Sequence, residues 1–114
     1  MPSNLDVPAE WTAQLRRGLL ELCILKLLRR RPTYGYELIA QLSGMGPLGA
    51  GENTVYPLLR RLRNEGALET YAVKSPNGPP RQNYRVTVAG ALRLRAIEEE
   101  WSALVRAMET MERD

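Results

Sequence analysis

The sequence predicts a mainly α-helical fold with one small β-hairpin. Apolar residues recur at spacings of three and four along four stretches of the chain, which is the period of a helix with one buried face. Between residues 68 and 87 the period changes to two, around a segment rich in Pro and Gly. With 114 residues, 44% of them hydrophobic and 25% charged, the chain has the size and composition of one globular domain.

The first two predicted helices cover residues 9–31 and 33–42. The first is apolar almost all round between residues 19 and 28, which favours burial on more than one side and hence a partner chain. Pro32 ends this helix, and Thr33 is the expected N-cap of the second. Three consecutive Arg residues at 29–31 are either a solvated helix end or a phosphate contact.

The third predicted helix lies within residues 51–66 and has two opposed faces. Its front carries amide, hydroxyl, phenol and guanidinium groups, which can bond to DNA base edges and phosphates. Because Pro57 fits best in a first turn, the helix begins either with Asn53 or Thr54 as N-cap, or near Glu52 with a bent first turn. The back of the helix is apolar and consists of Val55, Leu58, Leu59 and Leu62.

A hairpin follows the third helix. Gly66 is expected to end that helix in the left-handed conformation. Strands are predicted at residues 68–74 and 81–87, with a turn at 75–80. On the second strand, alternation separates two apolar-facing residues, Tyr84 and Val86, from a polar, basic set: Arg81, Asn83 and Arg85.

The last predicted helix covers residues 88–113, with Thr87 as its N-cap. Its apolar residues repeat at three- and four-residue intervals, which is the pattern of a helix that packs along a seam. We expect a second copy of the chain to cover this seam, and packing on the chain's own core is the alternative. The predicted dimer interface consists of Leu94, Ile97, Trp101, Leu104, Met108 and Met111.

The charge is unevenly distributed. The net charge is +3, but residues 15–87 hold twelve Lys or Arg against five acids, whereas residues 88–114 hold four against six. This asymmetry predicts a polyanionic partner for the first three quarters of the chain. We therefore divide the chain into a DNA-binding unit of residues 1–87, which includes the first helix and the hairpin, and a dimerisation helix of residues 88–114.

The composition also excludes several classes of protein. The sequence has no His and a single Cys, so neither a zinc site of the usual ligands nor a His-based catalytic triad is expected. We expect no metal, no cofactor and no enzymatic activity. No apolar stretch reaches the length of a membrane span and no secretory signal is recognisable, so a cytoplasmic location is expected.

The order of elements predicts a winged helix-turn-helix. The second and third helices form the helix-turn-helix, the hairpin is the wing, and the third helix enters the major groove. Two copies paired through the last helix would read a palindromic operator in double-stranded DNA, with half-sites one turn of the duplex apart. The expected DNA contacts are Tyr34, Tyr36, Asn53, Thr54, Tyr56, Arg60, Arg61, Lys74, Arg81 and Arg85.

Several motifs resemble the PadR family of winged-helix transcriptional regulators. They are GLLELCIL at 18–25, YGYEL at 34–38, TVYPLLRRL at 54–62 with EG at 65–66, and YRVTVAG at 84–90. The resemblance covers nearly the whole chain and is closest to short-form members with a single C-terminal helix. It departs from the family at 78–82, where GPPRQ lacks one basic residue that wings of the family often carry, and at Asn53, where Gly is common.

The resemblance implies a homodimeric DNA-binding repressor that a small molecule or a stress signal releases from its operator. It also implies, for some short-form members, an apolar cleft between the first and last helices that binds planar aromatic compounds. The residues that would line it here are Trp101, Leu15, Leu19 and Met108. The alternative function is a winged-helix adaptor that binds proteins and not DNA, against which the three Arg residues of the third helix argue.

Overall fold

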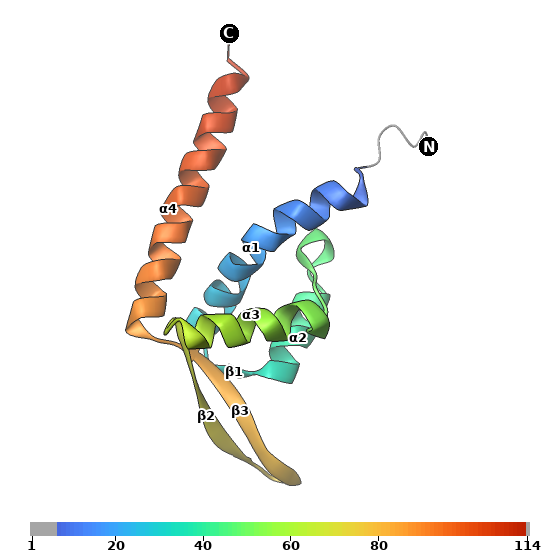
Figure 1. The fold of residues 1–114 in the computed structure, drawn as a ribbon, viewed down its shortest axis with the longest axis vertical. Coiled ribbons are helices and arrows are strands. Elements are labelled where there is room, and N and C mark those ends of the chain that lie inside the picture. Colours follow the sequence, from blue (N-terminus) through green and yellow to red (C-terminus); the bar gives the residue numbers. More distant parts are fainter. Residues whose placement is uncertain (1–6, 114) are drawn as a thin grey trace.

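The computed structural model describes residues 7–113 and confirms a mainly helical fold with a small sheet. The helix-turn-helix and the sheet lie at one end of an elongated molecule, and α4 and the first half of α1 extend from the other end (Figure 1). The elements are α1 (Ala9–Arg30), β1 (Thr33–Tyr34), α2 (Gly35–Ser43), the 3₁₀ turn η2 (Gly46–Leu48), α3 (Glu52–Asn64), β2 (Leu68–Ser75), β3 (Gly78–Val86) and α4 (Val88–Met111).

The core forms where α1, α2 and α3 meet. α1 has buried residues on more than one side, as its nearly continuous apolar sequence predicts. The apolar back of α3 is also as predicted, because Val55, Leu59 and Leu62 are fully buried and Leu58 is half-buried. The largest fully buried side chains are Leu20, Ile24, Leu25, Leu28, Leu38, Leu42, Leu59, Leu62, Leu68 and Val55.

The sheet has a third strand that the sequence did not predict. β1 pairs antiparallel with β3, so that Thr33 lies opposite Tyr84 and Tyr34 opposite Asn83, and the strand order is β1-β3-β2. The prediction that Thr33 caps α2 is therefore wrong. Thr33 is only 4% exposed and its hydroxyl donates to the Arg31 carbonyl oxygen at 3.2 Å, while Tyr34 holds the N-cap position.

The hairpin of β2 and β3 is longer than predicted. The expected turn at 75–80 shrinks to two residues, because β2 continues to Ser75 and β3 already begins at Gly78. The pairing is irregular between Val73 and Ser75, where one extra residue is accommodated. We call this hairpin the wing; it projects away from the helices (Figure 1).

α3 begins at Glu52, which supports the earlier of the two predicted starts and excludes Asn53 and Thr54 as N-caps. Gly51 holds the cap position, and its carbonyl oxygen accepts from the N–H groups of Thr54 and Val55 at 3.1 and 3.0 Å. Pro57 consequently lies inside the helix, where it cannot donate a backbone hydrogen bond.

The end of α3 matches the prediction. Gly66 has a φ of +82°, which is the left-handed region. Its N–H donates to the Arg63 carbonyl oxygen at 3.0 Å. The N–H of Ala67 donates to the Leu62 carbonyl oxygen at 2.9 Å. These two bonds form a Schellman motif, which satisfies carbonyl groups at the helix end.

α4 starts directly against the end of α3. The Thr87 hydroxyl accepts from the Gly90 N–H at 3.0 Å, which confirms the predicted N-cap, and donates to the Gly66 carbonyl oxygen at 2.6 Å. Gly90 lies so close to Ala67 that a Cβ atom at this position would overlap the Ala67 carbonyl oxygen. The helix ends at Met111.

Candidate nucleic-acid interface

The outer face of α3 is polar and exposed along its whole length. Asn53 and Thr54 lie in its first turn, and Arg60 and Arg63 lie on its second half. Neither Arg60 nor Arg63 forms an ion pair with any of the described residues. Their guanidinium groups are therefore free to meet an anion. The sequence did not predict Arg63 as a DNA contact. It lies three residues after Arg60, however, so the two side chains are neighbours on the same face of the helix.

A group of tyrosines joins the start of α2 to α3. The rings of Tyr34 and Tyr36 stack with their centroids 6.4 Å apart, and Tyr36 is largely exposed. Tyr56 of α3 lies over Gly35, where an added Cβ atom would be 3.1 Å from the Tyr56 ring. The three predicted tyrosines thus come together on one surface, with phenol groups that can bond to phosphate oxygens.

The wing contributes basic groups in two different states. The Arg81 guanidinium lies over the Tyr34 ring at 4.7 Å, which links the wing to the start of α2. Arg85 is engaged elsewhere, because its Nε donates to Glu69 Oε1 at 2.7 Å and its guanidinium lies over the Tyr71 ring at 4.5 Å. Lys74 is exposed and forms no ion pair with the described residues.

Arg61 differs from its neighbours on α3. Its half-exposed guanidinium pairs with Glu21 at 2.9 Å and with Glu65 at 3.2 Å. Arg93 of α4 pairs with the same two carboxylates, each at 2.7 Å. The hydrogen bond from Arg93 and that from Arg61 hold the pKa of Glu65 below its usual value.

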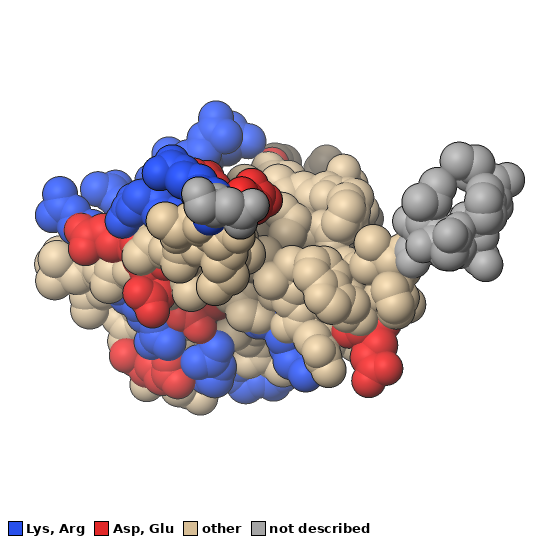
Figure 2. Space-filling view, turned by 90° about the horizontal axis from the view of Figure 1, so that it is seen from above, with Lys and Arg blue, Asp and Glu red and all other residues tan. Residues whose placement is uncertain are grey.

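The predicted dimer seam divides into two parts. Leu94 is buried, and Ile97 and Trp101 are half-buried against the core. Leu104, Met108 and Met111 are 50%, 52% and 78% exposed. Figure 2 views the molecule from the end at which α4 terminates. Charged side chains gather on one side of this view, and uncharged residues cover much of the other side.

A shallow apolar groove lies between α1 and α4. It has a volume of about 280 Å³, and its lining includes three of the four residues predicted for the effector cleft: Leu15, Leu19 and Trp101. The fourth, Met108, is one turn further along α4 than Leu104 and does not line the groove.

A second apolar hollow of about 340 Å³ is also lined by Trp101, together with Cys23 and Leu48. Burial raises the pKa of the Cys23 thiol.

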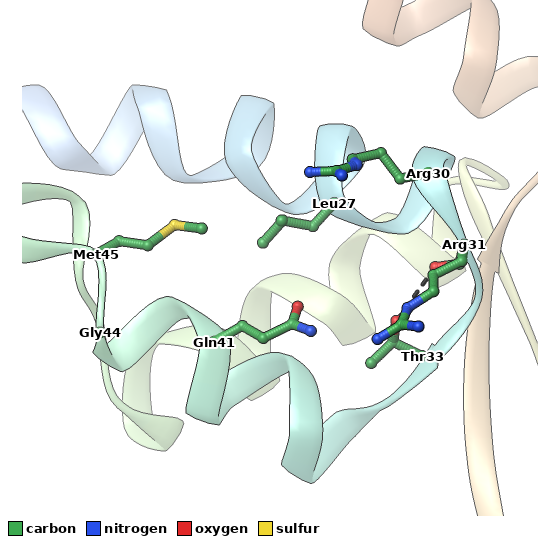
Figure 3. Close-up of a pocket in the computed structure, with 7 residues that line it drawn as sticks. All are labelled: Leu27, Arg30, Arg31, Thr33, Gln41, Gly44 and Met45. Carbon is green, nitrogen blue, oxygen red and sulfur yellow. Dashed lines mark hydrogen bonds between the residues drawn. The ribbon is translucent and has the colours of Figure 1, made fainter.

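A larger and more polar pocket of about 580 Å³ lies between the end of α1 and α2. Arg30 and Arg31 border it on one side and Gln41 on the other, while Leu27 and Met45 point toward each other at its far end (Figure 3). Arg31 pairs with Glu37 at 3.5 Å. Within the described residues, no group of three or more His, Cys, Asp or Glu could hold a metal ion, and no helix is long and apolar enough to cross a membrane.

A two-helix unit whose second helix presents free amide and guanidinium groups, followed by a β-hairpin, defines a winged helix-turn-helix DNA-binding protein. Comparison with known families is consistent with this class. Residues 24–96 match the model of the transcriptional regulator PadR-like family, and the chain belongs to that family. Its members are transcriptional regulators and not enzymes.

Solved structures agree with the assignment over nearly the full chain. A PadR family transcriptional regulator from Eggerthella lenta is 35% identical, with a TM-score of 0.80 and 92% of each chain covered. A PadR-like transcription factor from Bacteroides fragilis is 36% identical, with a TM-score of 0.74 over 90% of this chain and 98% of that one. A PadR-like transcriptional regulator from Bacillus cereus is 31% identical, with a TM-score of 0.78 over 89% and 98%.

Proposed function

We propose that this protein is a homodimeric regulator that binds a palindromic operator. The observation that carries the proposal is the division of α3 into a fully buried back and an exposed front of hydrogen-bonding and cationic groups. A helix of this kind can enter the major groove while its back stays attached to the core. A protein that reads chromosomal DNA acts where the chromosome lies, so the proposal includes the cytoplasm as its location.

The proposed contacts follow from the chemistry of each group. Asn53 and Thr54, at the start of α3, face base edges, and the Asn53 amide can bond adenine with both its ends. Phosphate oxygens are bound by guanidinium, ammonium and phenol groups that neutralise or hydrogen-bond to them. This second set consists of Tyr34, Tyr36, Tyr56, Arg60, Arg63, Lys74 and Arg81, and Arg85 joins it if a phosphate displaces Glu69.

The dimer proposal is supported by the free half of the α4 seam. Leu104 and Met108 expose large apolar side chains, and Leu104 lines the groove between α1 and α4 together with the half-exposed Leu15. An exposed apolar strip of this length, flanked by a groove, is more typical of an interface than of a free surface. Two copies related by a two-fold axis would present their α3 helices to successive major grooves, about 34–36 Å apart.

Within this proposal the regulator acts as a repressor that an effector releases. The apolar groove beside Trp101 has a lining suited to a flat aromatic compound, with the indole ring as a stacking surface. A panel of planar aromatic compounds can be titrated against the fluorescence of the two Trp residues. Compounds that quench the signal should also release the protein from its operator, and a Trp101→Ala variant should lose both responses.

The central test is DNA binding by variants that differ in one charge. A duplex that the wild-type protein selects from a random pool supplies the operator for gel-shift titrations. Arg60→Gln should weaken binding and lower the slope of log K against log salt by about 1–2, because each dimer loses two phosphate contacts. Arg95→Gln on α4 removes the same charge away from α3 and should bind like wild type. Equal affinity of both variants would contradict the proposed face.

A further inference from the structure

Two acids and two arginines form a closed ring of ion pairs at the junction of three helices. Arg61 of α3 pairs with Glu21 of α1 at 2.9 Å and with Glu65, at the end of α3, at 3.2 Å. Arg93 of α4 completes the ring, at 2.7 Å from each carboxylate. Charges alternate around the ring, so each guanidinium has two carboxylates and each carboxylate has two guanidiniums. The ring thus joins the DNA-facing helix directly to α1 and α4.

Glu21 is the least exposed member of the ring. Its side chain is 13% exposed, whereas those of Arg61, Glu65 and Arg93 are 48%, 40% and 36% exposed. The charged form of a carboxylate that is mostly withdrawn from water is stable only while its cationic partners are in place, because an unpaired buried charge is unfavourable. The two oxygens of Glu21 bond to different helices, Oε1 to Arg61 and Oε2 to Arg93. Glu21 therefore links α3 to α4 through its two oxygens.

The ring lies at one end of α3 and the proposed base contacts lie at the other. Arg61 and Asn53 are eight residues apart, which is about 12 Å along a helix. A rotation of α3 by about 5° around the ring would displace Asn53 by about 1 Å. That displacement is enough to spoil a bidentate hydrogen bond to a base, since such bonds tolerate only a narrow range of distance.

We infer that Glu21 is a positioning residue for DNA recognition: through Arg61 and Arg93 it holds α3 at the angle to α4 that the operator requires. This inference rests on the proposed function. It assigns Arg61 to the ring and not to a phosphate, unlike Arg60 and Arg63, which face outward without an ion pair among the described residues. It also explains how one helix can carry adjacent arginines with opposite roles.

A competing explanation predicts the opposite result. If Arg61 were a phosphate contact that Glu21 merely competes for, removal of the Glu21 charge would free Arg61 and strengthen DNA binding. If Glu21 positions α3, the same change weakens binding. The salt dependence separates the two further, because a phosphate contact changes the slope of log K against log salt and a positioning residue does not.

The experiment compares Glu21→Gln, Arg93→Gln and Arg61→Gln with wild type on the duplex that wild type selects from a random pool. We expect each variant to bind about two- to thirtyfold more weakly, the range typical of residues that act through a coupled network. The salt slope should stay at the wild-type value in all three. Arg93→Gln serves as the second route to the same result, because it breaks the ring from α4 and leaves both partners of Arg61 in place.

A matched control comes from the other ion pair between α1 and α4. Lys26 and Glu98 lie 3.3 Å apart, and neither forms an ion pair with α3 among the described residues, so Glu98→Gln should bind DNA like wild type. Thermal unfolding checks that each variant is folded at the temperature of the titration. Tighter binding by Glu21→Gln, or a reduced slope for Arg61→Gln, would overturn the inference and leave the proposed function intact. Selection of no duplex by wild type would overturn both.

Discussion

The two halves of the α4 seam have the same sequence pattern but different surroundings. Leu94, Ile97 and Trp101 pack against the core of their own chain, whereas Leu104, Met108 and Met111 extend beyond it. α4 and α1 diverge toward the C-terminal end of α4 and the N-terminal end of α1 (Figure 1), and the apolar side chains of the second half are at least half exposed in the described part of the chain. One continuous repeat therefore serves the fold in its first half, and in our proposal it serves the dimer in its second.

The largest expected effect is at the start of α4. Gly90→Ala would bring a methyl group into the Ala67 carbonyl oxygen and within 2.9 Å of Val86 Cγ1. Since both neighbours belong to the junction of α3, the wing and α4, we expect a loss of at least about 3 kcal/mol in the free energy of unfolding. Urea titration followed by circular dichroism measures it. Gly18→Ala on α1, where a Cβ atom meets nothing within 4 Å, is the control and should be neutral or slightly stabilising.

The second-largest expected effect is a difference in the free energy of unfolding between variants in the two halves of the α4 seam. Leu94→Ala removes a buried side chain and should lower the free energy of unfolding by about 2–5 kcal/mol. Met111→Ala, at the exposed end of the same seam, should change it by no more than about 0.5 kcal/mol in a protein dilute enough to be monomeric. Equal losses in the two variants would show that the halves do not differ in the single chain.

The third expected effect is on dimer formation, which we assign to the second half of the α4 seam. Leu104→Glu combined with Met108→Glu places four negative charges across a two-fold interface, so the dimer should dissociate while the helical signal persists. Sedimentation at micromolar concentration measures the change in mass. The proposed interface would be wrong if the double variant sediments like wild type. Glu109→Gln, one residue beyond Met108, is the matched surface change that should leave association intact.

The smallest effect concerns acid. Because its partners lower the pKa of Glu65, the folded state gains stability from this carboxylate above the ordinary pKa of about 4.3, and loses it as the pH falls through the lowered value. The difference in unfolding temperature between wild type and Glu65→Gln should therefore be full at neutral pH and shrink as the pH falls below the ordinary carboxyl range. A difference independent of pH would contradict the ion-pair assignment at the start of α4.

Local patterns in the sequence were sufficient for much of the fold. The Schellman end at Gly66, the Thr87 cap and the burial of Val55, Leu59 and Leu62 each depend on residues within one or two turns of each other. The start of α3 was ambiguous in the sequence because Pro57 is best tolerated in a first turn, which favours a later start. In the structure the helix starts earlier, since the Gly51 carbonyl oxygen accepts its first backbone hydrogen bonds.

Contacts between distant residues were not predictable in this way. β1 has two residues, too few to show alternation, and forms only because β3 lies beside it. The partners of Arg61 and Arg85 are also set by the tertiary fold, so four similar basic residues on α3 and the wing could not be divided by sequence into free and paired ones. Arg60 and Lys74 are free of ion pairs among the described residues, whereas Arg61 and Arg85 are engaged.

The stacking of Arg81 on Tyr34 has a consequence for the cost of binding. A β-hairpin that contacts its body only through its two ends must lose motional freedom when it meets a rigid duplex, and that loss subtracts from affinity. Here the Arg81 guanidinium lies 4.7 Å from the centre of the Tyr34 ring, and β1 pairs with β3. Both contacts restrict the motion of the hairpin relative to the helices in the free protein. Part of the entropic penalty is thus met during folding, and the free protein presents a hairpin whose orientation is already restricted.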